Sequence, residues 1–336
     1  MVASSYAGAV RAGTMAASRI HQRLGLRQGM DVGGSIDVFR AIHTLDLPLL
    51  LKPLQGLLGA YLNEPTPGVL VTTQRPMSIQ RFTAAHELGH FVMGHRPSLD
   101  DESILRRMPV AGERAADLQE IEADAFAVEF MMPRWLILWH AARQGWTAED
   151  FREPDTVYQL ALRIGASYEA TCWTLVRHRL IAQPIAIALL GTQPRDLKAA
   201  LLEAYRPADY RGDVWLLTER DAGTRVAGSR NDRFVLRLKE HSGGGYLWDM
   251  DQLKASGFAV VRDELKANDG DGIGGPVIRR VTAEPMEPYS GPLSLDERRP
   301  WDPDEAVARL EMDVDLTGPE EDGLSRAERR SLLEAA

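Results

Sequence analysis

The sequence predicts a multidomain α+β protein with three successive regions. Helical and short extended patterns alternate up to Pro133, and a helix, a turn and a second helix follow at residues 155–180. Beyond Asp209, short apolar runs bounded by Gly, Asn or Asp predict strands, namely VWLL, RFVLRL and FAVV. The 336 residues are enough for about two to three domains of ordinary size.

The composition is typical of a soluble globular protein and argues against several other classes. Hydrophobic residues make up 44% of the chain and charged residues 26%. The net charge of −9 argues against a dominant nucleic-acid surface. Cys172 is the single cysteine, which excludes an internal disulfide and indicates a reducing compartment. The N-terminus has no continuous apolar signal segment, and no apolar run could span a bilayer. We therefore expect a cytoplasmic protein without a membrane partner.

Local patterns define the elements of the first region. The predicted helices and strands cover residues 18–26, 37–45, 49–52, 69–72, 79–93 and 114–131. A turn at residues 63–68 separates the two strands, and Pro133 ends the last helix. The connection at residues 95–112 is polar, and we expect it to be mobile.

The helix-turn-helix pattern at residues 155–180 has two interpretations. In the first, the second helix enters a DNA groove and places three basic side chains near the phosphates: Arg177, His178 and Arg179. In the second, four apolar side chains pack against the preceding region: Leu160, Ile164, Trp173 and Val176. The acidic net charge and the absence of a basic run favour packing, so DNA is the less favoured partner.

The most specific feature of the sequence is the H-E-x-x-H motif His86-Glu87-Leu88-Gly89-His90 within a helical pattern. Residues four apart lie on one face of a helix, so His86 and His90 can present two imidazole nitrogens to one metal ion. Glu87 lies beside the first ligand, where a carboxylate can take a proton from water and deliver it again. A catalytic zinc ion requires a third protein ligand and leaves a fourth position open for water.

Two sources of the third ligand close to the motif are disfavoured. One common zinc motif requires glycine and histidine where this chain has Met93 and Arg96. His95 follows His90 by five residues, which on a continuous helix rotates it off the ligand face. We therefore interpret His95 as a surface histidine.

The downstream helix offers a better third ligand. Glu120 and Asp124 are four residues apart and share one helix face. Glu120 could complete the zinc site, and Asp124 could accept the outer N–H of a ligand histidine and fix its tautomer. Glu122 is the less favoured ligand because its position points about 160° away from that face.

Two sequence blocks carry a resemblance to a known family: QRFTAAHELGHFVMGH and EIEADAFAVEFMMP. Both are similar to the ImmA/IrrE family of zinc metallopeptidases, and the similarity covers about residues 30–182. The resemblance implies a small zincin-like (gluzincin-like) α/β fold, a Zn²⁺ cofactor and site-specific cleavage of a helix-turn-helix transcriptional repressor. Carried over by position, the metal ligands are His86, His90 and Glu120, and the catalytic carboxylate is Glu87.

The C-terminal region resembles the chagasin-like inhibitors of papain-type cysteine peptidases. The residues that carry the resemblance lie at 231–248, 270–275 and 298–301. It implies an immunoglobulin-like β-sandwich whose three loops cluster at one end and enter a protease cleft. The first loop departs from the family, because His241-Ser242-Gly243-Gly244-Gly245-Tyr246 stands where the family has Asn-Pro-Thr-Thr-Gly-Tyr. Losing the proline and both threonines raises the cost of ordering this loop on binding.

Within this region we expect Trp248 in the core and Trp301 as an exposed anchor. The residues we expect to contact a protein or peptide are Gly245, Tyr246, Arg299, Pro300 and Trp301. Two partners are consistent with these loops: a cysteine peptidase, as in the family, or a substrate recruited to the metal centre.

These observations divide the chain into five parts. The parts are a zinc metallopeptidase domain (1–145), a helix-turn-helix-like segment (146–182), a helical linker (183–208), a chagasin-like β-sandwich (209–318) and a charged C-terminal tail (319–336). The function they predict is zinc-dependent cleavage of a regulatory protein, with the β domain binding a protein or peptide. Two alternatives are a non-catalytic sensor whose β domain inhibits a papain-like peptidase, and a DNA-binding regulator acting through residues 155–180.

Overall fold

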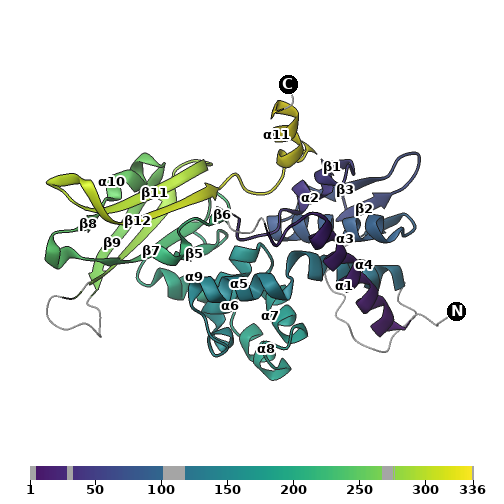
Figure 1. Cartoon of the computed structure of the whole chain (residues 1–336), viewed down its shortest axis with the longest axis horizontal. Helices are drawn as coiled ribbons and strands as arrows, with labels where there is room; N and C mark the ends of the chain where they lie inside the picture. Colours follow the sequence, from purple (N-terminus) through teal and green to yellow (C-terminus); the bar gives the residue numbers. More distant parts are fainter. Residues whose placement is uncertain (1–4, 29–32, 101–117, 267–274, 276, 335–336) are drawn as a thin grey trace.

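The computed structural model describes residues 5–28, 33–100, 118–266, 275 and 277–334. The described chain is elongated, with an N-terminal α/β region at one end, helices in the middle and a β-rich region at the other end (Figure 1). This arrangement confirms the predicted order of the three regions. None of the described helices is long and apolar enough to cross a membrane.

The N-terminal region consists of a five-stranded sheet and four helices. The strands are β1 (Leu49–Lys52), β2 (Gly59–Leu62), β3 (Gly68–Thr72), β4 (Ser98–Asp100) and β13 (Gly323–Leu324). The helices are α1 (Tyr6–Arg23), α2 (Val38–Thr44), α3 (Met77–Met93) and α4 (Leu118–Met131). The strand order is β13-β1-β3-β2-β4. Strands β1 and β3 are parallel, and the other neighbours are antiparallel.

Helices α3 and α4 approach each other closely at Gly89. A Cβ atom added there would lie 3.1 Å from Phe126 Cδ1 and 3.2 Å from Ala123 Cα. A side chain at this position would push the two helices apart, so the glycine allows their backbones to lie close together. This contact lets side chains on α4 reach those on α3.

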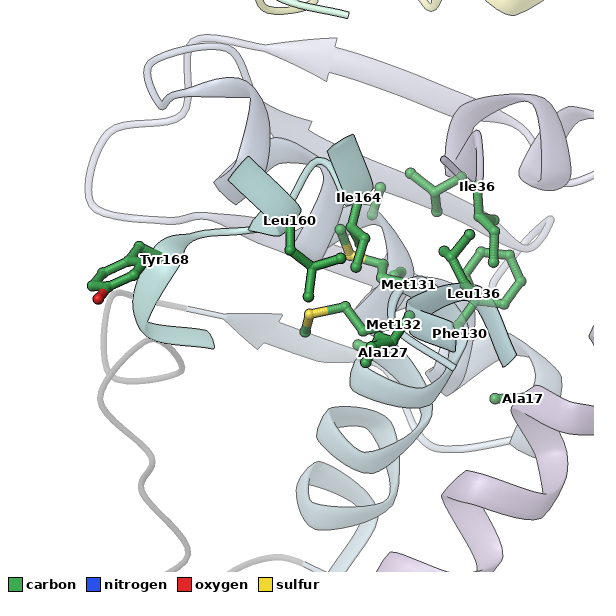
Figure 2. Close-up of a cluster of buried hydrophobic side chains, with 14 of the residues drawn as sticks. Ala17, Ile36, Ala127, Phe130, Met131, Met132, Leu136, Leu160, Ile164 and Tyr168 are labelled. Atoms are coloured by element: carbon green, nitrogen blue, oxygen red, sulfur yellow. The ribbon is translucent and has the colours of Figure 1, made fainter. Parts of the chain in front are cut away.

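The helical middle shares one hydrophobic core with the N-terminal region. Its helices are α5 (Arg134–Gln144), the 3₁₀ turn η3 (Asp150–Arg152), α6 (Pro154–Ile164), α7 (Tyr168–Arg177), α8 (Gln183–Leu190) and α9 (Pro194–Leu202). Figure 2 shows part of the shared core, which includes Ala17, Ile36, Ala127, Phe130, Met131, Met132, Leu136, Leu160, Ile164 and Tyr168. The two regions are therefore packed as one body.

Helices α6 and α7 form the predicted helix-turn-helix, and their contacts agree with the packing interpretation. Leu160 and Ile164 are buried in the shared core, and Trp173 and Val176 pack against it. The basic end of α7 is held by the rest of the protein. Arg177 Nη2 donates to Thr14 Oγ1 at 2.6 Å, and the His178 ring lies 2.9 Å from the Met132 carbonyl oxygen.

The C-terminal region contains two four-stranded sheets with the orders β5-β7-β10-β9 and β6-β12-β11-β8. The strands are β5 (Val214–Leu217), β6 (Arg225–Ala227), β7 (Arg233–Glu240), β8 (Leu247–Trp248), β9 (Phe258–Lys266), β10 (Val277–Pro285), β11 (Ser290–Arg299) and β12 (Asp302–Asp315). Short helices accompany them at η4 (Glu219–Asp221), η5 (Ser242–Gly244) and α10 (Met250–Ala255). Side chains from both sheets form one core, which includes Phe234 and Val281 from one sheet and Leu295 and Met312 from the other. Trp248 is 2% exposed within this core, as predicted.

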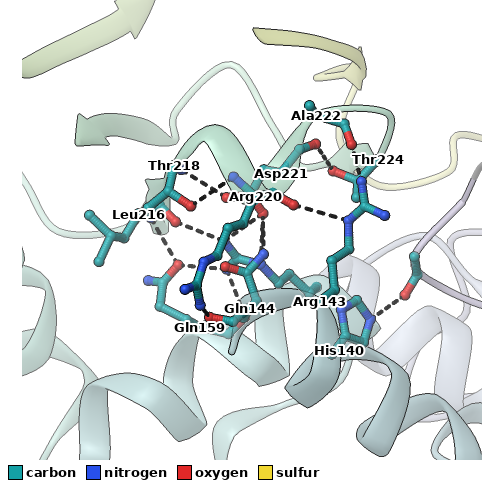
Figure 3. A network of polar contacts seen from close by, with 12 residues as sticks. His140, Arg143, Gln144, Gln159, Leu216, Thr218, Arg220, Asp221, Ala222 and Thr224 are labelled. Carbon is teal, nitrogen blue, oxygen red and sulfur yellow. Dashed lines mark hydrogen bonds and ion pairs between the residues drawn. The ribbon is translucent and has the colours of Figure 1, made fainter. Parts of the chain in front are cut away.

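A buried polar network joins the helical middle to the β-rich region (Figure 3). Arg163 donates from Nε and Nη2 to Asp221 Oδ1 at 3.1 and 2.9 Å, and Gln144 Nε2 donates to the same oxygen at 2.7 Å. The side chain of Gln159 continues the network, because its Nε2 donates to the Val214 carbonyl and its Oε1 accepts from the backbone N–H of Leu216, both at 2.8 Å. These bonds satisfy polar groups that the interface removes from water.

The segment expected to be a charged tail returns to the N-terminal region. Strand β13 pairs with β1, with Leu50 opposite Leu324, and helix α11 (Arg326–Glu334) follows near α2 (Figure 1). Gln80 fixes the approach of this segment, because its side chain donates to the Glu320 carbonyl at 3.2 Å and accepts from the Glu320 N–H at 2.8 Å. The sequence expectation differs because a two-residue strand between charged stretches leaves no periodic pattern.

Candidate metal centre and binding loops

Helix α3 holds the two histidines of the H-E-x-x-H motif one turn apart. The Nε2 atoms of His86 and His90 are 2.9 Å apart, and both side chains are completely buried. Tyr61 on β2 stacks against the His90 ring with an interplanar angle of 8° and a centroid distance of 6.3 Å. The two rings thus present nitrogens to one point, as the spacing predicts.

Helix α4 brings the carboxylate of Glu120 to the same point. Glu120 Oε2 lies 3.3 Å from His86 Nε2, and Glu120 Oε1 lies 3.7 Å from His90 Nε2. The close contact of the two helices at Gly89 makes this reach possible.

Asp100 is a fourth member of the cluster that the sequence motifs do not predict. Its Oδ2 atom lies 3.3 Å from His86 Nε2, and the residue is buried. Asp100 belongs to the stretch interpreted as a mobile polar connection, but residues 98–100 form the strand β4, while residues 101–112 lie outside the described chain. No sequence signal reveals this strand, because it has three residues and a single apolar side chain that faces solvent.

The four side chains fit a divalent metal ion. One ligand atom from each of His86, His90, Asp100 and Glu120 lies within 4.8 Å of the others. Two imidazoles and two carboxylates are donors that zinc and related transition metals accept. The pKa of His86 also agrees with a metal site. Burial lowers the pKa of His86, but hydrogen bonds to the surrounding carboxylates outweigh burial and hold this pKa well above its ordinary value. The cluster therefore favours positive charge at its centre, which a bound cation would supply.

The outer nitrogens of the two histidines have separate partners. Asp124 Oδ1 lies 2.9 Å from His86 Nδ1, in the position proposed for it from the sequence. His90 Nδ1 lies 3.0 Å from His95 Nδ1, and His95 Nε2 lies 2.9 Å from Glu122 Oε2. If both ligand histidines carry their proton on Nδ1, every contact has one donor and one acceptor, and both Nε2 atoms are left for a metal.

The interpretation of His95 as a surface histidine is wrong. Its side chain is 8% exposed and contacts His90. The helical spacing used for that interpretation does not apply, because α3 ends at Met93 and Gly94 has a left-handed φ of 67°. The chain therefore turns back, and the His95 N–H donates to the His90 carbonyl at 3.0 Å. Gly94, a frequent helix-ending residue, was the available signal.

Glu87 is completely buried beside the cluster and close to strand β2. A Cβ atom added at Gly59 would lie 2.6 Å from Glu87 Oε1. Burial raises the pKa of Glu87 well above its ordinary value; the adjacent His86 opposes this shift, and the carboxyl group of Asp100 adds to it. Glu87 can therefore hold a proton more readily than an exposed glutamate.

A second cluster of predicted residues lies at one end of the β-rich region. Arg299 lies over the Tyr246 ring at 4.4 Å and donates from Nε to the Gly244 carbonyl at 3.2 Å. Gly245 has a φ of 80°, and a Cβ atom there would lie 2.6 Å from the Trp301 ring. Trp301 is 72% exposed, as predicted, and Pro300 lies in the turn between β11 and β12. The third predicted loop, residues 270–275, lies outside the described chain except for Gly275.

Comparison with known proteins matches two families to separate parts of the chain. The IrrE N-terminal-like domain (Peptidase M78) matches residues 42–176, and the chagasin family of peptidase inhibitors (I42) matches residues 229–315. The chain joins an IrrE N-terminal-like domain to a chagasin-family domain. Both resemblances inferred from the sequence are thereby confirmed. In the IrrE-like domain, family membership and the buried histidine–glutamate cluster together indicate a metallopeptidase.

The chagasin-family domain is similar to several small proteins. Over 91 residues, which are 26% of this chain and 73% of the relative, the chain is 25% identical to Amoebiasin-2 from Entamoeba histolytica. The crystal structure of the cysteine protease inhibitor EhICP2 from Entamoeba histolytica is 22% identical to this chain. The match covers 32% of this chain and 98% of the EhICP2 chain, with a TM-score of 0.27. The solution structure of Amebosin is 21% identical to this chain. The match covers 31% of this chain and 96% of the Amebosin chain, with a TM-score of 0.25.

Proposed function

We propose that the IrrE-like domain is a zinc-dependent endopeptidase of the zincin type that cleaves a regulatory protein. The observation that supports this most is the convergence of His86, His90 and Glu120 on one buried point, with Glu87 adjacent. When bound there, a zinc ion supplies Lewis acidity toward water and toward the carbonyl of the scissile peptide bond.

The chain's own residues would do the remaining chemistry. His86, His90 and Glu120 hold the ion, and Asp124 orients the ring of His86 through its outer nitrogen. Glu87 takes the proton of the attacking water and later delivers it to the leaving amine. Burial disfavours the charged form of Glu87, which helps the group to hold the proton between the two steps.

The metal content of the full-length chain tests the metal centre directly. Elemental analysis of the purified protein should find about one zinc ion per chain, and His86→Ala with His90→Ala should abolish this content. The metal-loaded chain should also cut a protein substrate into discrete fragments. The first candidates are helix-turn-helix repressors encoded beside this gene, as the family resemblance implies. A purified, folded chain without stoichiometric transition metal would contradict the proposal.

We propose as a second function that the chagasin-like domain, an immunoglobulin-like sandwich, binds a papain-type cysteine peptidase through the loop cluster, which consists of Gly245, Tyr246, Arg299, Pro300 and Trp301. The exposed Trp301 favours this function, because large exposed aromatic side chains are frequent anchors of protein interfaces. The glycine-rich loop lacks the family's proline and threonines, but Arg299 and Trp301 hold it at Gly244 and Gly245. These contacts reduce the ordering cost predicted from the sequence.

Replacing Trp301 with Ala should weaken inhibition of a papain-like peptidase by the full chain at least about thirtyfold, because an interface anchor contributes about 2 kcal/mol or more. The measurement is the inhibition constant at fixed ionic strength. Met286→Ala is the matched control. Met286 is also an exposed apolar side chain, but it precedes β11, whereas Trp301 follows that strand. Equal inhibition by the wild type and the Trp301 variant would exclude the anchor role.

A further inference from the structure

Strand β4 covers the outer edge of β2, the strand beside Glu87. It pairs antiparallel with β2, placing Ser98, Leu99 and Asp100 opposite Tyr61, Ala60 and Gly59. The Leu58 N–H also donates to the Asp100 carbonyl at 2.7 Å. Extended peptides commonly bind proteins by adding a strand to a sheet edge. In this chain, β4 itself occupies that position along β2, and its Asp100 pairs with Gly59, the residue close to Glu87.

The same strand directs a carboxylate into the metal cluster. Leu99 is 68% exposed, whereas the neighbouring Asp100 is 2% exposed and reaches His86 Nε2 at 3.3 Å. The Ser98 hydroxyl lies 3.1 Å from Asp100 Oδ1 and 3.2 Å from Glu120 Oε1. Side chains alternate across a strand, so the pairing of β4 with β2 fixes Asp100 toward the cluster.

A fourth protein ligand changes what a zinc site can do. Catalytic zinc sites have three protein ligands and an open position for water, whereas sites with four protein ligands are closed. His86, His90 and Glu120 provide three donors here, and Asp100 provides the fourth within the same 4.8 Å group.

We propose that the described structure is a latent form of the peptidase, in which β4 acts as an internal occupant of the substrate edge and Asp100 closes the metal site as a fourth ligand. This inference rests on the proposed function. Activation then requires a single displacement: withdrawal of β4 frees the edge of β2 for an extended substrate and the fourth metal position for water. Among the described residues, β4 pairs with β2 at three positions, so few of the described backbone contacts hold the latent form.

Access of a small anion to the metal tests this proposal without relying on cleavage. The full chain is loaded with cobalt(II), and azide is titrated while the visible d–d bands are recorded. The wild type should exclude azide, whereas Asp100→Ala should bind it with an apparent dissociation constant at least tenfold lower. Asp100→Asn is the second variant, because the amide preserves the shape of the side chain and is a poorer ligand. Leu99→Ala is the matched control, since it changes the exposed side chain of the same strand, and it should exclude azide as the wild type does.

The outcomes separate the two proposals. If the wild type admits azide as readily as both Asp100 variants, or if all three exclude it, Asp100 does not close the site and the latent form is refuted, although the metal centre stands. If neither the wild type nor the variants bind cobalt, the metal centre itself fails. If azide enters the Asp100 variants alone, those variants should also cleave a protein substrate at least tenfold faster than the wild type.

Discussion

Replacing Glu87 with Gln is expected to lower peptide-bond cleavage about a thousandfold while the metal remains bound. Gln has nearly the same shape as Glu but cannot accept the proton of the attacking water. Glu87 is not among the four side chains that converge on the metal point, so the ligands are unchanged. Single-turnover cleavage rates and the metal content per chain are the two measurements, and the rate should fall without a change in stoichiometry.

The control for this prediction is Glu149→Gln, which makes the same chemical change on a side chain that is 74% exposed. Because the wild type is proposed to be latent, both substitutions are also compared in the Asp100→Ala background. Cleavage by Glu87→Gln within tenfold of its parent would show that another group accepts the proton. Loss of the metal together with cleavage would instead give Glu87 a role in metal binding.

The second large effect is expected at the interface in Figure 3, where Asp221→Ala should lower the free energy of unfolding by about 3–5 kcal/mol. Arg163 and Asp221 are both buried, and Asp221 Oδ1 accepts three hydrogen bonds, two from Arg163 and one from Gln144. Removing the carboxylate leaves the guanidinium as a buried charge without its counter-ion, which is more costly than losing the pair as a whole. Urea denaturation followed by circular dichroism measures the change.

Two comparisons test the cause of this destabilisation. Asp251→Ala removes a carboxylate from an exposed pair with Lys254 and should change stability far less than Asp221→Ala does. The double variant Arg163→Met with Asp221→Leu removes both charges and should recover part of the stability lost in Asp221→Ala. If the double variant is no more stable than Asp221→Ala, the unpaired charge is not the cause.

The sequence contained enough to predict most of the candidate metal centre. His86 and His90 follow from helical spacing within one motif, and Glu120 and Asp124 follow from the same spacing on a second helix. Asp100 could not be predicted in this way, because it reaches the cluster through pairing between strands that are distant in sequence. The helical angle does not predict the position of His95, because the helix ends before Gly94.

In the β-rich region, the sequence predicts some strands and not others. The run RFVLRL, which lies in β7, contains consecutive apolar residues and was recognised as a strand. The longer strand β12 was not, because acidic residues alternate with its buried residues Leu310, Met312 and Val314. That alternation is the pattern of a strand with one face on the core, but the acidic composition obscured it.

The pairing of β13 with β1 has a consequence for biosynthesis. Translation delivers β1 early, but its outer neighbour emerges only after the whole β-rich region has left the ribosome. During most of its elongation, a nascent chain therefore has backbone N–H and C=O groups on the outer edge of β1 without a partner strand. Unpaired strand edges promote association between chains. A chain that terminates before residue 323 lacks β13, so the edge of β1 stays exposed permanently. Such truncated products would be prone to association through the N-terminal sheet.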